Sequence, residues 1–279
     1  MSVVCNAEPD VITETMAATM YPGLPGSTPD GAGSEAQVPG GVVEDAIQAE
    51  LEDIVESVTH ALRSPLWAID GFLRPALEQR LAELEPAFRD DLQLVLGAAE
   101  RMTRMVNALA RLAGICQHAP ALTRVDLSAA AQVVGRELQH RHAERCVQFR
   151  VEPGLCVRGD HQLLQMALAE LLQNAWKFTQ AHPTAHISFG ACREPDPDAP
   201  VAPGQIVLCV RDDGVGFNPN HTDRLFHPFQ RLHPQSQFEG LGMGLVFVRR
   251  IVHKHGGRIW ARSQAQGGAA FFFTLAGPV

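Results

Sequence analysis

The feature that most constrains this chain is an apolar stripe that runs from position 47 to position 109 with one interruption. Its members recur every three or four residues, the spacing of one helix face. The first run is Ile47, Leu51, Ile54, Val58, Leu62, Leu66, Ile69, Leu73, Leu77, Leu81 and Leu84. The second is Phe88, Leu92, Val95, Ala99, Met102, Val106 and Leu109, with the alternating steps of a coiled coil. "EPAF", residues 85–88, lies between them, so we predict two long helices joined by a tight turn.

A single helical hairpin leaves much of such a stripe exposed to water. Two hairpins would bury it in an antiparallel four-helix bundle, so we predict a homodimer. Pro65 lies inside the first helix and, since it lacks a backbone donor, should kink the helix there. Residues 1–41 contain five prolines and no Lys or Arg, which is typical of a disordered or loosely ordered leader. A short helix at Val11–Met20 is the one element we expect within it.

After Leu122 short apolar runs alternate with helical stretches. "CVQFRVEP", "AHISFGACR", "QIVLCVRDD", "RIWARS" and "AAFFFTL" predict strands, and residues 127–145, 161–179 and 242–255 predict helices. This mixture indicates an α/β sandwich with a mixed sheet, and "EPDPDAPVAPGQ" a hairpin loop between two strands. We therefore predict an α+β chain with a leader at 1–41, a dimerisation hairpin at 42–120 and a sandwich domain at 121–279.

Composition excludes several classes of protein. A net charge of -8 argues against nucleic-acid binding, which needs a basic surface. Six cysteines without a CxxC pair suit reduced thiols in a cytosol. The chain has neither a signal peptide nor an apolar run of about 20 residues, so we predict a cytoplasmic protein without membrane insertion. We expect Trp67, Trp176 and Trp260 in the core, with a partner-facing Trp67 near His60 as the alternative.

Four local motifs follow one another in the second half. In "ELLQNAWKFT", residues 170–179, a helix would bring Glu170, Asn174, Lys177 and Phe178 to one face. An amide oxygen can bind Mg²⁺, and a lysine can meet phosphate oxygens. This motif alone is weak, because a lone Asn on a helix is usually a solvated surface residue.

The other three motifs add an acid, aromatic residues and glycines. "DDGVGF", residues 212–217, follows a strand and offers a carboxylate that can accept a hydrogen bond from an adenine amino group. "LFHPFQRLH", residues 225–233, places two aromatic residues around a proline. "GLGMGL", residues 240–245, opens a helix, whose exposed amides attract phosphate. Glycines before a helix are more often a simple turn, but a chance origin of all four in this order is very unlikely.

In this order the motifs resemble the N, G1, F and G2 boxes of sensor histidine kinases of two-component systems, most closely the phytochrome-like branch. "THALRSPLWAIDGF", residues 59–72, resembles the H box of that family. The resemblance covers about residues 44–275. It implies dimerisation and phosphoacceptor helices followed by a GHKL-type ATP-binding domain.

The resemblance also implies roles for individual residues. His60 would be the phosphoacceptor, on the solvent side of its helix, and Asn174 would bind Mg²⁺ beside the ATP phosphates. Lys177 would contact the nucleotide, and Asp212 would read the adenine, in a pocket shaped by Gly214 and Gly216. Residues 218–239 would form a lid anchored by Phe226 and Phe229. Gly240, Gly242, Gly244 and Leu245 would let the backbone wrap the phosphates. The implied reaction transfers the γ-phosphoryl group of ATP to His60 and then to an Asp of a response regulator receiver domain.

Three residues depart from the family pattern. Ala61 stands where an acid usually orients the acceptor imidazole, and its loss removes general-base help of about 10²-fold or more. Ser64 stands where a Thr or Asn supports phosphatase activity, so we expect that activity to be weak. Glu170 replaces a common Asn; in related ATPases a Glu there activates water, while the plainer interpretation is a Mg²⁺ or water contact.

Two functions of different class therefore remain. The first is an active histidine kinase, and the second is a pseudokinase, a dimeric adaptor or ATP-dependent switch that transfers little or no phosphate because of Ala61. A serine-directed kinase of the same fold is a weaker third option. The residues before the first helix are too few for a sensor domain with its own core, so we expect the input to come from an upstream sensor partner or through the leader.

Overall fold

The computed structural model describes residues 40–80, 85–193, 201–234, 237–263 and 267–278. The chain divides into two compact units, Met1–Asp45 and Ala46–Val279. Most of the predicted leader, including the short helix at 11–20, lies outside the described residues. The predicted domain boundaries at 41 and 120 stay predictions. No described helix is both long enough and apolar enough to span a lipid bilayer.

Two long helices come first, α2 (Gly40–Arg80) and α3 (Pro86–Gln117). Arg74 of α2 lies 2.7 Å from Glu100 of α3 and 2.8 Å from Asp70, an ion-pair network that joins the two helices. The helices bury only part of the stripe against each other, at Leu66, Leu77, Ala99 and Val106. The predicted tight turn at 85–88 is wrong, because α3 begins at Pro86. A proline suits this position, since its fixed φ fits a helix and its missing donor would have no partner there.

Much of the predicted helical seam faces solvent in this single chain. Val58, Leu62, Ile69, Phe88, Val95 and Met102 are exposed. Trp67 is 68% exposed and Phe72 82%, so the expectation of a core position for Trp67 is wrong. The physical reason is that, among the described residues, α2 packs on α3 alone, and Trp67 lies on a face that α3 does not cover. The four-helix bundle, which needs a second chain, stays a prediction.

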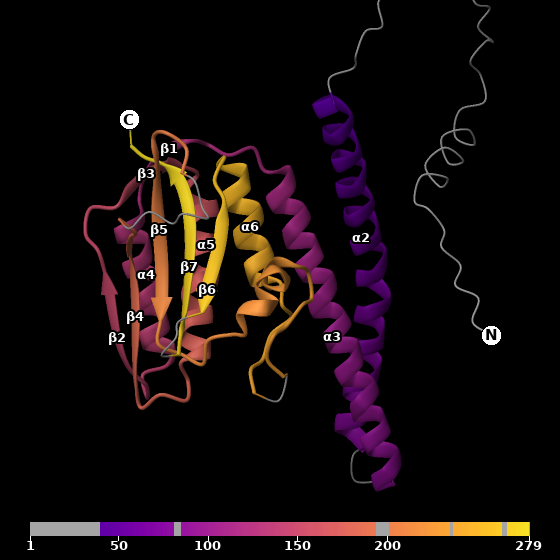
Figure 1. Cartoon of the computed structure of the whole chain (residues 1–279). Helices are drawn as coiled ribbons and strands as arrows, with labels where there is room; N and C mark the ends of the chain where they lie inside the picture. Colours follow the sequence, from indigo (N-terminus) through magenta and orange to yellow (C-terminus); the bar gives the residue numbers. More distant parts are fainter. Residues whose placement is uncertain (1–39, 81–84, 194–200, 235–236, 264–266, 279) are drawn as a thin grey trace, which may run out of the picture. The chain divides into compact units, whose positions relative to one another are not determined.

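The second half forms a five-stranded sheet with helices on one face (Figure 1). The strands run in the order β2 (Cys146–Val151), β4 (Thr184–Ala191), β5 (Gln205–Asp212), β7 (Ala269–Ala276) and β6 (Ile259–Ser263). β2 pairs parallel with β4 and the other pairs are antiparallel, which confirms the mixed sheet. The covering helices are α4 (Leu127–Arg141), α5 (His161–Phe178) and α6 (Gly244–Lys254).

Three short elements were not predicted. β1 (Thr123–Asp126) and β3 (Cys156–Gly159) pair antiparallel in a separate two-stranded sheet. A 3₁₀ helix, η1, covers Pro219–Phe226. The two strands have four residues each, some of them charged. They are too short to show the alternation of apolar and polar residues that predicts a strand.

The core lies between the sheet and its helices. β7 alternates: Phe271, Phe273 and Leu275 face the helices, whereas Ala270 and Phe272 form a small cluster on the other face. Trp176 of α5 is 2% exposed and meets the Phe149 ring edge-on at 5.4 Å, as its predicted core position requires. Trp260 lies on the other face, stacked on Phe272.

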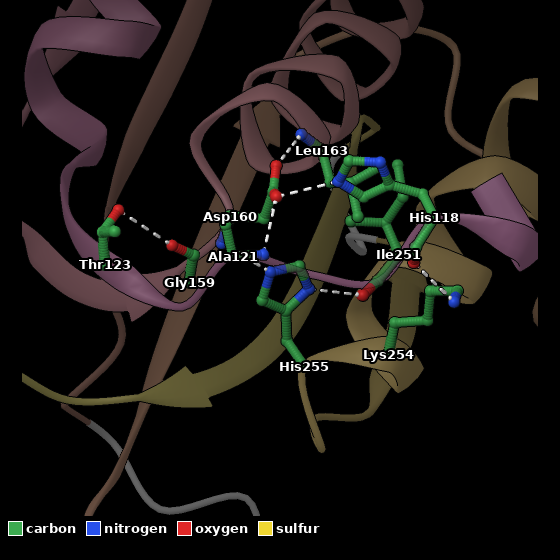
Figure 2. A network of polar contacts seen from close by, with 9 residues as sticks. All are labelled: His118, Ala121, Thr123, Gly159, Asp160, Leu163, Ile251, Lys254 and His255. Carbon is green, nitrogen blue, oxygen red and sulfur yellow. Dashed lines mark hydrogen bonds and ion pairs between the residues drawn. The ribbon is translucent and has the colours of Figure 1, made fainter. Parts of the chain in front are cut away.

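A buried polar network fixes where α5 begins (Figure 2). Asp160 is the N-cap of α5, and its Oδ1 accepts a hydrogen bond from the Leu163 amide at 3.0 Å. Its Oδ2 accepts from the Ala121 amide at 3.0 Å and lies 2.9 Å from His118 Nε2. Burial alone would raise the pKa of Asp160, but these hydrogen bonds outweigh it and hold the pKa well below its ordinary value. Asp160 is therefore a carboxylate that joins the end of α3 to α5.

The same network reaches the end of α6 (Figure 2). His255 Nε2 accepts the backbone N–H of Asp160 at 2.9 Å, so its Nδ1 carries the proton and donates to the Ile251 carbonyl at 2.7 Å. Lys254 Nζ donates to the His118 carbonyl at 2.9 Å. Residues 118–121, α5 and α6 are thus held together by buried hydrogen bonds.

Candidate nucleotide site

A cavity of about 570 Å³ opens among α3, α5, α6 and the ends of β5 and β7. It gathers residues from all the motifs of the second half. Of the predicted site residues, those that line it are Glu170, Asn174, Lys177, Asp212, Gly216, Gly240, Gly242, Gly244 and Leu245. A cavity of this size, with a few convergent polar groups, is typical of a small-molecule site.

Asp212 lies at the floor of this cavity, at the end of β5. Its Oδ1 accepts a hydrogen bond from the Gly214 amide at 2.9 Å. Burial raises the pKa of Asp212 to about 6, opposed by hydrogen bonds from the Gly214 and Ala269 amides. Gly214 does not line the cavity, but a Cβ on it would lie 2.5 Å from the Phe178 carbonyl oxygen. Only glycine therefore lets the chain turn so closely past α5 and leave the Asp212 carboxyl facing the cavity.

Lys177, near the end of α5, also lines the cavity. Its Nζ donates to the Glu239 carbonyl at 3.1 Å and lies 4.4 Å from the centre of the Phe178 ring. Burial and the nearby Arg231 cation lower the pKa of Lys177, and Glu170 partly opposes them. Water solvates the Lys177 ammonium group poorly in this position. An anionic ligand would therefore stabilise its charged form.

Glu170 and Asn174 meet the start of α6. A Cβ on Gly244 would lie 2.6 Å from Glu170 Oε2 and 3.9 Å from Asn174 Nδ2. The other carboxylate oxygen of Glu170 lies 2.7 Å from Arg111 Nη1 of α3. A carboxylate and an amide oxygen, one helical turn apart, are the oxygen donors that Mg²⁺ prefers.

The glycines before α6 shape the backbone around the cavity. Gly242 has φ +75°, and a Cβ there would lie 2.3 Å from the Gln230 carbonyl oxygen. The N-cap of α6, Met243, makes no side-chain hydrogen bond to the first turn. The first amides of α6 are therefore free of a side-chain cap beside the cavity, and such amides attract anions.

The segment between η1 and α6 closes one side of the cavity through aromatic contacts. The rings of Phe178 and Phe238 lie 4.9 Å apart, and His233 is 5.4 Å from each of them. His233 Nε2 also lies 2.9 Å from the Gly216 carbonyl oxygen, so the ring donates to it. Phe226 packs on the core, whereas Phe229 has φ +58°, is 39% exposed and is not one of the lining residues of the described chain.

His60 lies on α2 and is not among the described residues that line the cavity. It and Ser64 are exposed, and Ala61 beside it is exposed as well. Among the described residues none forms a hydrogen bond with the His60 ring. Pro65 lacks the N–H that would otherwise bond the Ala61 carbonyl, so the helix has an open backbone acceptor next to His60.

Sequence reasoning missed the contribution of α3 to the cavity. Arg104, Asn107, Ala108 and Arg111 line it, as do Arg231 and Phe238 from the segment before α6. The spacing of Arg104, Ala108 and Arg111 places them on one face of a helix. No signal in the sequence tells what that face meets.

The fold and the cavity define a GHKL-type nucleotide-binding domain joined to a helical hairpin. Residues 159–278 match the family described as Histidine kinase-, DNA gyrase B-, and HSP90-like ATPase. The structure of full-length ShkA in complex with AMPPNP shares the fold, with a TM-score of 0.55 and 22% identity over 81% of this chain and 46% of that one.

Relatives extend the match beyond this domain. The chain is 32% identical over 238 residues to the methanogenesis regulatory histidine kinase FilI of Methanothrix harundinacea, covering 84% of this chain and 25% of FilI. It is 30% identical over 230 residues to cyanobacterial phytochrome A of Nostoc sp., covering 81% of this chain and 28% of that protein. The chain thus spans only about a quarter of the length of these relatives. Residues 159–278 belong to the histidine kinase-like ATPase family, and the resemblance to phytochrome-like histidine kinases is confirmed.

Proposed function

We propose that the chain is an ATP-dependent protein-histidine kinase that phosphorylates His60 and passes the phosphoryl group to an Asp of a response regulator. The observation that carries the proposal is the convergence of Asp212, Lys177, Asn174 and an uncapped helix start on one cavity. Between them these groups offer an acceptor for the adenine amino group, a cation and free amides for phosphate oxygens, and an amide oxygen for Mg²⁺. The histidine kinase relatives support the same reaction class.

In this proposal the adenine of ATP lies at Asp212 and its phosphates lie at the start of α6. Asp212 accepts a hydrogen bond from the amino group of adenine, and the amides of the first turn of α6 donate to phosphate oxygens. Lys177 exchanges its backbone acceptor for a phosphate oxygen. Asn174 and Glu170 would hold Mg²⁺, which when bound neutralises phosphate charge.

The transfer forms one bond and breaks one. A ring nitrogen of His60 attacks the γ-phosphorus in line, the bond to the β,γ-bridging oxygen breaks, and ADP leaves with the electron pair. The proton of the other ring nitrogen passes to solvent, because Ala61 offers no carboxylate to take it. We therefore expect slow transfer, since the imidazole acts without its usual base. An Asp carboxylate oxygen of the receiver domain then attacks the phosphorus, the P–N bond breaks, and the ring nitrogen takes a proton from solvent to restore neutral His60.

A second candidate is a pseudokinase that binds ATP as a dimeric adaptor or switch. The observation that favours it is the exposed His60 beside Ala61, with no described side chain orienting the ring. In this case the cavity binds ATP and His60 stays unmodified.

The exposed half of the helical seam supports the homodimer. Val58, Leu62 and Val95 are apolar residues left in water by a single hairpin. Burying them against a second hairpin would stabilise the pair, at about 25 cal/mol per Å² of apolar surface removed from water. Light scattering at micromolar concentration tests this, and a monomer would contradict it.

Labelled autophosphorylation decides between the two functions. The full chain is incubated with γ-labelled ATP beside His60→Ala and Ala61→Glu. A kinase acquires acid-labile label that His60→Ala loses, and Ala61→Glu increases the rate about 10²-fold as the acid is restored. Acid-stable label would indicate a serine kinase. ATP binding without label in the wild type, with label in Ala61→Glu, would establish the pseudokinase.

A further inference from the structure

One face of the five-stranded sheet is covered by no helix of the described chain (Figure 1). The helices α4, α5 and α6 pack on the other face, where the nucleotide cavity also opens. The open face has a small apolar cluster at its centre, made of Cys209, Ala270 and Phe272, with Cys192, Val207 and Trp260 packed against them. An apolar cluster that is left uncovered in this way is a candidate interaction surface.

Three hollows lie next to one another on the open face. Their volumes are about 360, 490 and 590 Å³, and Arg211 of β5 lines all three. Because they share this residue, they form one groove across the open face. The described lining of this groove includes four arginines and one acid, namely Arg150, Arg193, Arg211, Arg262 and Glu152. The groove is therefore rich in positive charge, although the whole chain has a net charge of -8.

Two arginines of the open face lie over aromatic rings. The guanidinium carbon of Arg211 lies 5.5 Å from the centre of the Phe272 ring, and that of Arg258 lies 5.3 Å from the centre of the Trp260 ring. The rings of Trp260 and Phe272 are themselves stacked, with their centres 5.5 Å apart. A guanidinium that packs on a ring keeps its N–H groups at the edge, where they can bind a carboxylate.

No carboxylate of the described chain neutralises Arg211. Its Nη2 lies 4.0 Å from Cys192 Sγ, and a thiol is only a weak acceptor. Burial raises the pKa of Cys209 to about 12, so this thiol stays neutral beside Arg211. Glu152 already pairs with Arg193 at 2.8 Å. The groove therefore attracts a negatively charged partner.

The apolar floor of the groove is recessed below its charged rim. Phe272 is 8% exposed and Cys209 is 4% exposed, and Trp260 is half-buried. Arg211 and Arg262 are exposed. A surface that inserts into a lipid bilayer presents protruding apolar side chains, whereas a recessed floor accepts a side chain from a partner. Shape and charge together favour a protein segment over a membrane.

We propose that this groove binds an acidic segment of a partner protein. Carboxylates of the segment pair with Arg211 and Arg262, and one apolar side chain packs on Trp260 and Phe272. The nucleotide cavity lies on the other face of the sheet. The groove is therefore a separate site, and its role does not rest on the proposed kinase reaction.

The test measures by fluorescence anisotropy how the full chain binds a short fluorescein-labelled peptide of Asp and Glu with one central Phe. One comparison peptide carries Asn and Gln in place of the acids, and another carries Ala in place of the Phe. The groove variants are Arg211→Gln and Arg262→Gln. The matched control is Arg136→Gln, an exposed arginine of α4 that is not among the described residues lining the groove. Far-UV circular dichroism checks that each variant folds.

We expect each groove variant to lower the affinity for the acidic peptide about 10-fold or more, the worth of a hydrogen bond to a charged group. The neutral peptide and the Ala peptide should bind more weakly than the acidic one, and added salt should weaken acidic binding. Arg136→Gln should match the wild type. Equal affinities for the acidic and neutral peptides, or for the wild type and both groove variants, overturn the proposal. So does an absence of acidic-peptide binding up to about 1 mM.

Two other sources of negative charge have outcomes of their own. Vesicles of phosphatidylcholine and phosphatidylserine that sediment the wild type but not Arg211→Gln, with no binding of the peptide, would assign the groove to a lipid surface and overturn the proposal. Glu194, Asp196 and Asp198 follow Arg193 in the sequence and could compete for the same arginines. A variant with Glu194→Gln, Asp196→Asn and Asp198→Asn should therefore bind the peptide at least as tightly as the wild type. Weaker binding by this variant would contradict the charge argument.

Discussion

Replacing Asp212 by asparagine should stabilise the fold while it weakens ATP binding. Burial raises the pKa of Asp212 from its ordinary 3.8 to about 6. Because the folded-state pKa lies above the unfolded one, the unfolded chain loses its proton first as pH rises. The unfolding free energy therefore falls between pH 4 and 6, and the loss is complete above pH 6. The full loss of unfolding free energy is about 3 kcal/mol. It follows from the difference between the unfolded and folded pKa values, because a difference of one in pKa is worth about 1.4 kcal/mol.

The pH dependence separates this effect from any packing change. The buried Asp212 carboxyl lowers the unfolding free energy by about 0.5 kcal/mol at pH 4 and by about 3 kcal/mol at pH 8. Asparagine keeps an amide oxygen to accept from Gly214 but carries no charge at either pH. The effect of Asp212→Asn on the unfolding free energy should thus be more favourable at pH 8 than at pH 4 by about 2 kcal/mol. Urea unfolding followed by circular dichroism at the two pH values measures it.

Asp213 is a matched control on the next residue. Its burial would raise its pKa, but hydrogen bonds from the His186 backbone and ring outweigh this and lower the pKa of Asp213. Its carboxylate therefore stabilises the fold above its unfolded pKa, so Asp213→Asn should lose stability at pH 8. Asp212→Asn should also weaken ATP binding about 10- to 100-fold, the worth of a hydrogen bond to a charged group. Equal effects of Asp212→Asn at the two pH values would show that its pKa is not raised.

Two further variants test the glycine at position 242 and the polar network around Asp160. Gly242→Ala forces an L side chain to φ +75°, which costs about 1–2 kcal/mol, and places a Cβ against the Gln230 carbonyl oxygen, so ATP should bind at least about 10-fold more weakly. Its control is Gly71→Ala in α2, where a Cβ meets nothing within 4 Å; calorimetric titration with ATP should show no change there. Asp160→Asn keeps an N-cap but loses the charge that His118 contacts, so it should cost about 1–3 kcal/mol at pH 7. Because the folded-state pKa of Asp160 is lowered, that cost should fade as pH drops below 4, which urea unfolding at both pH values would reveal.

The sequence predicted the long helices, the five strands of the main sheet and the motif residues of the cavity because these depend on local patterns, whereas β1, β3 and η1 are too short to show one. Periodicity places Glu170, Asn174 and Lys177 on one face of α5, and the structure brings that face to the cavity. Local patterns cannot predict which residues distant along the chain come into contact. The contact between Arg111 and Glu170 joins residues 59 positions apart, and no local pattern encodes it. Trp67 was misplaced for a related reason, since apolar character shows that a residue favours burial but not which neighbour covers it.

The two contacts between α3 and α5 have a joint consequence for the site. Arg111 pairs with Glu170 and His118 pairs with Asp160, so the later residue of α3 meets the earlier residue of the α5 segment. The two segments therefore run antiparallel and are joined at two points, the middle of α5 at Glu170 and its N-cap at Asp160. A slide of one helical turn, about 5.4 Å, would break both contacts, because each spans less than 3 Å. Lys254 adds a third tie from α6 to the His118 carbonyl. Any movement of α3 along α5 must therefore release Glu170 at the cavity and Asp160 at the N-cap of α5 together.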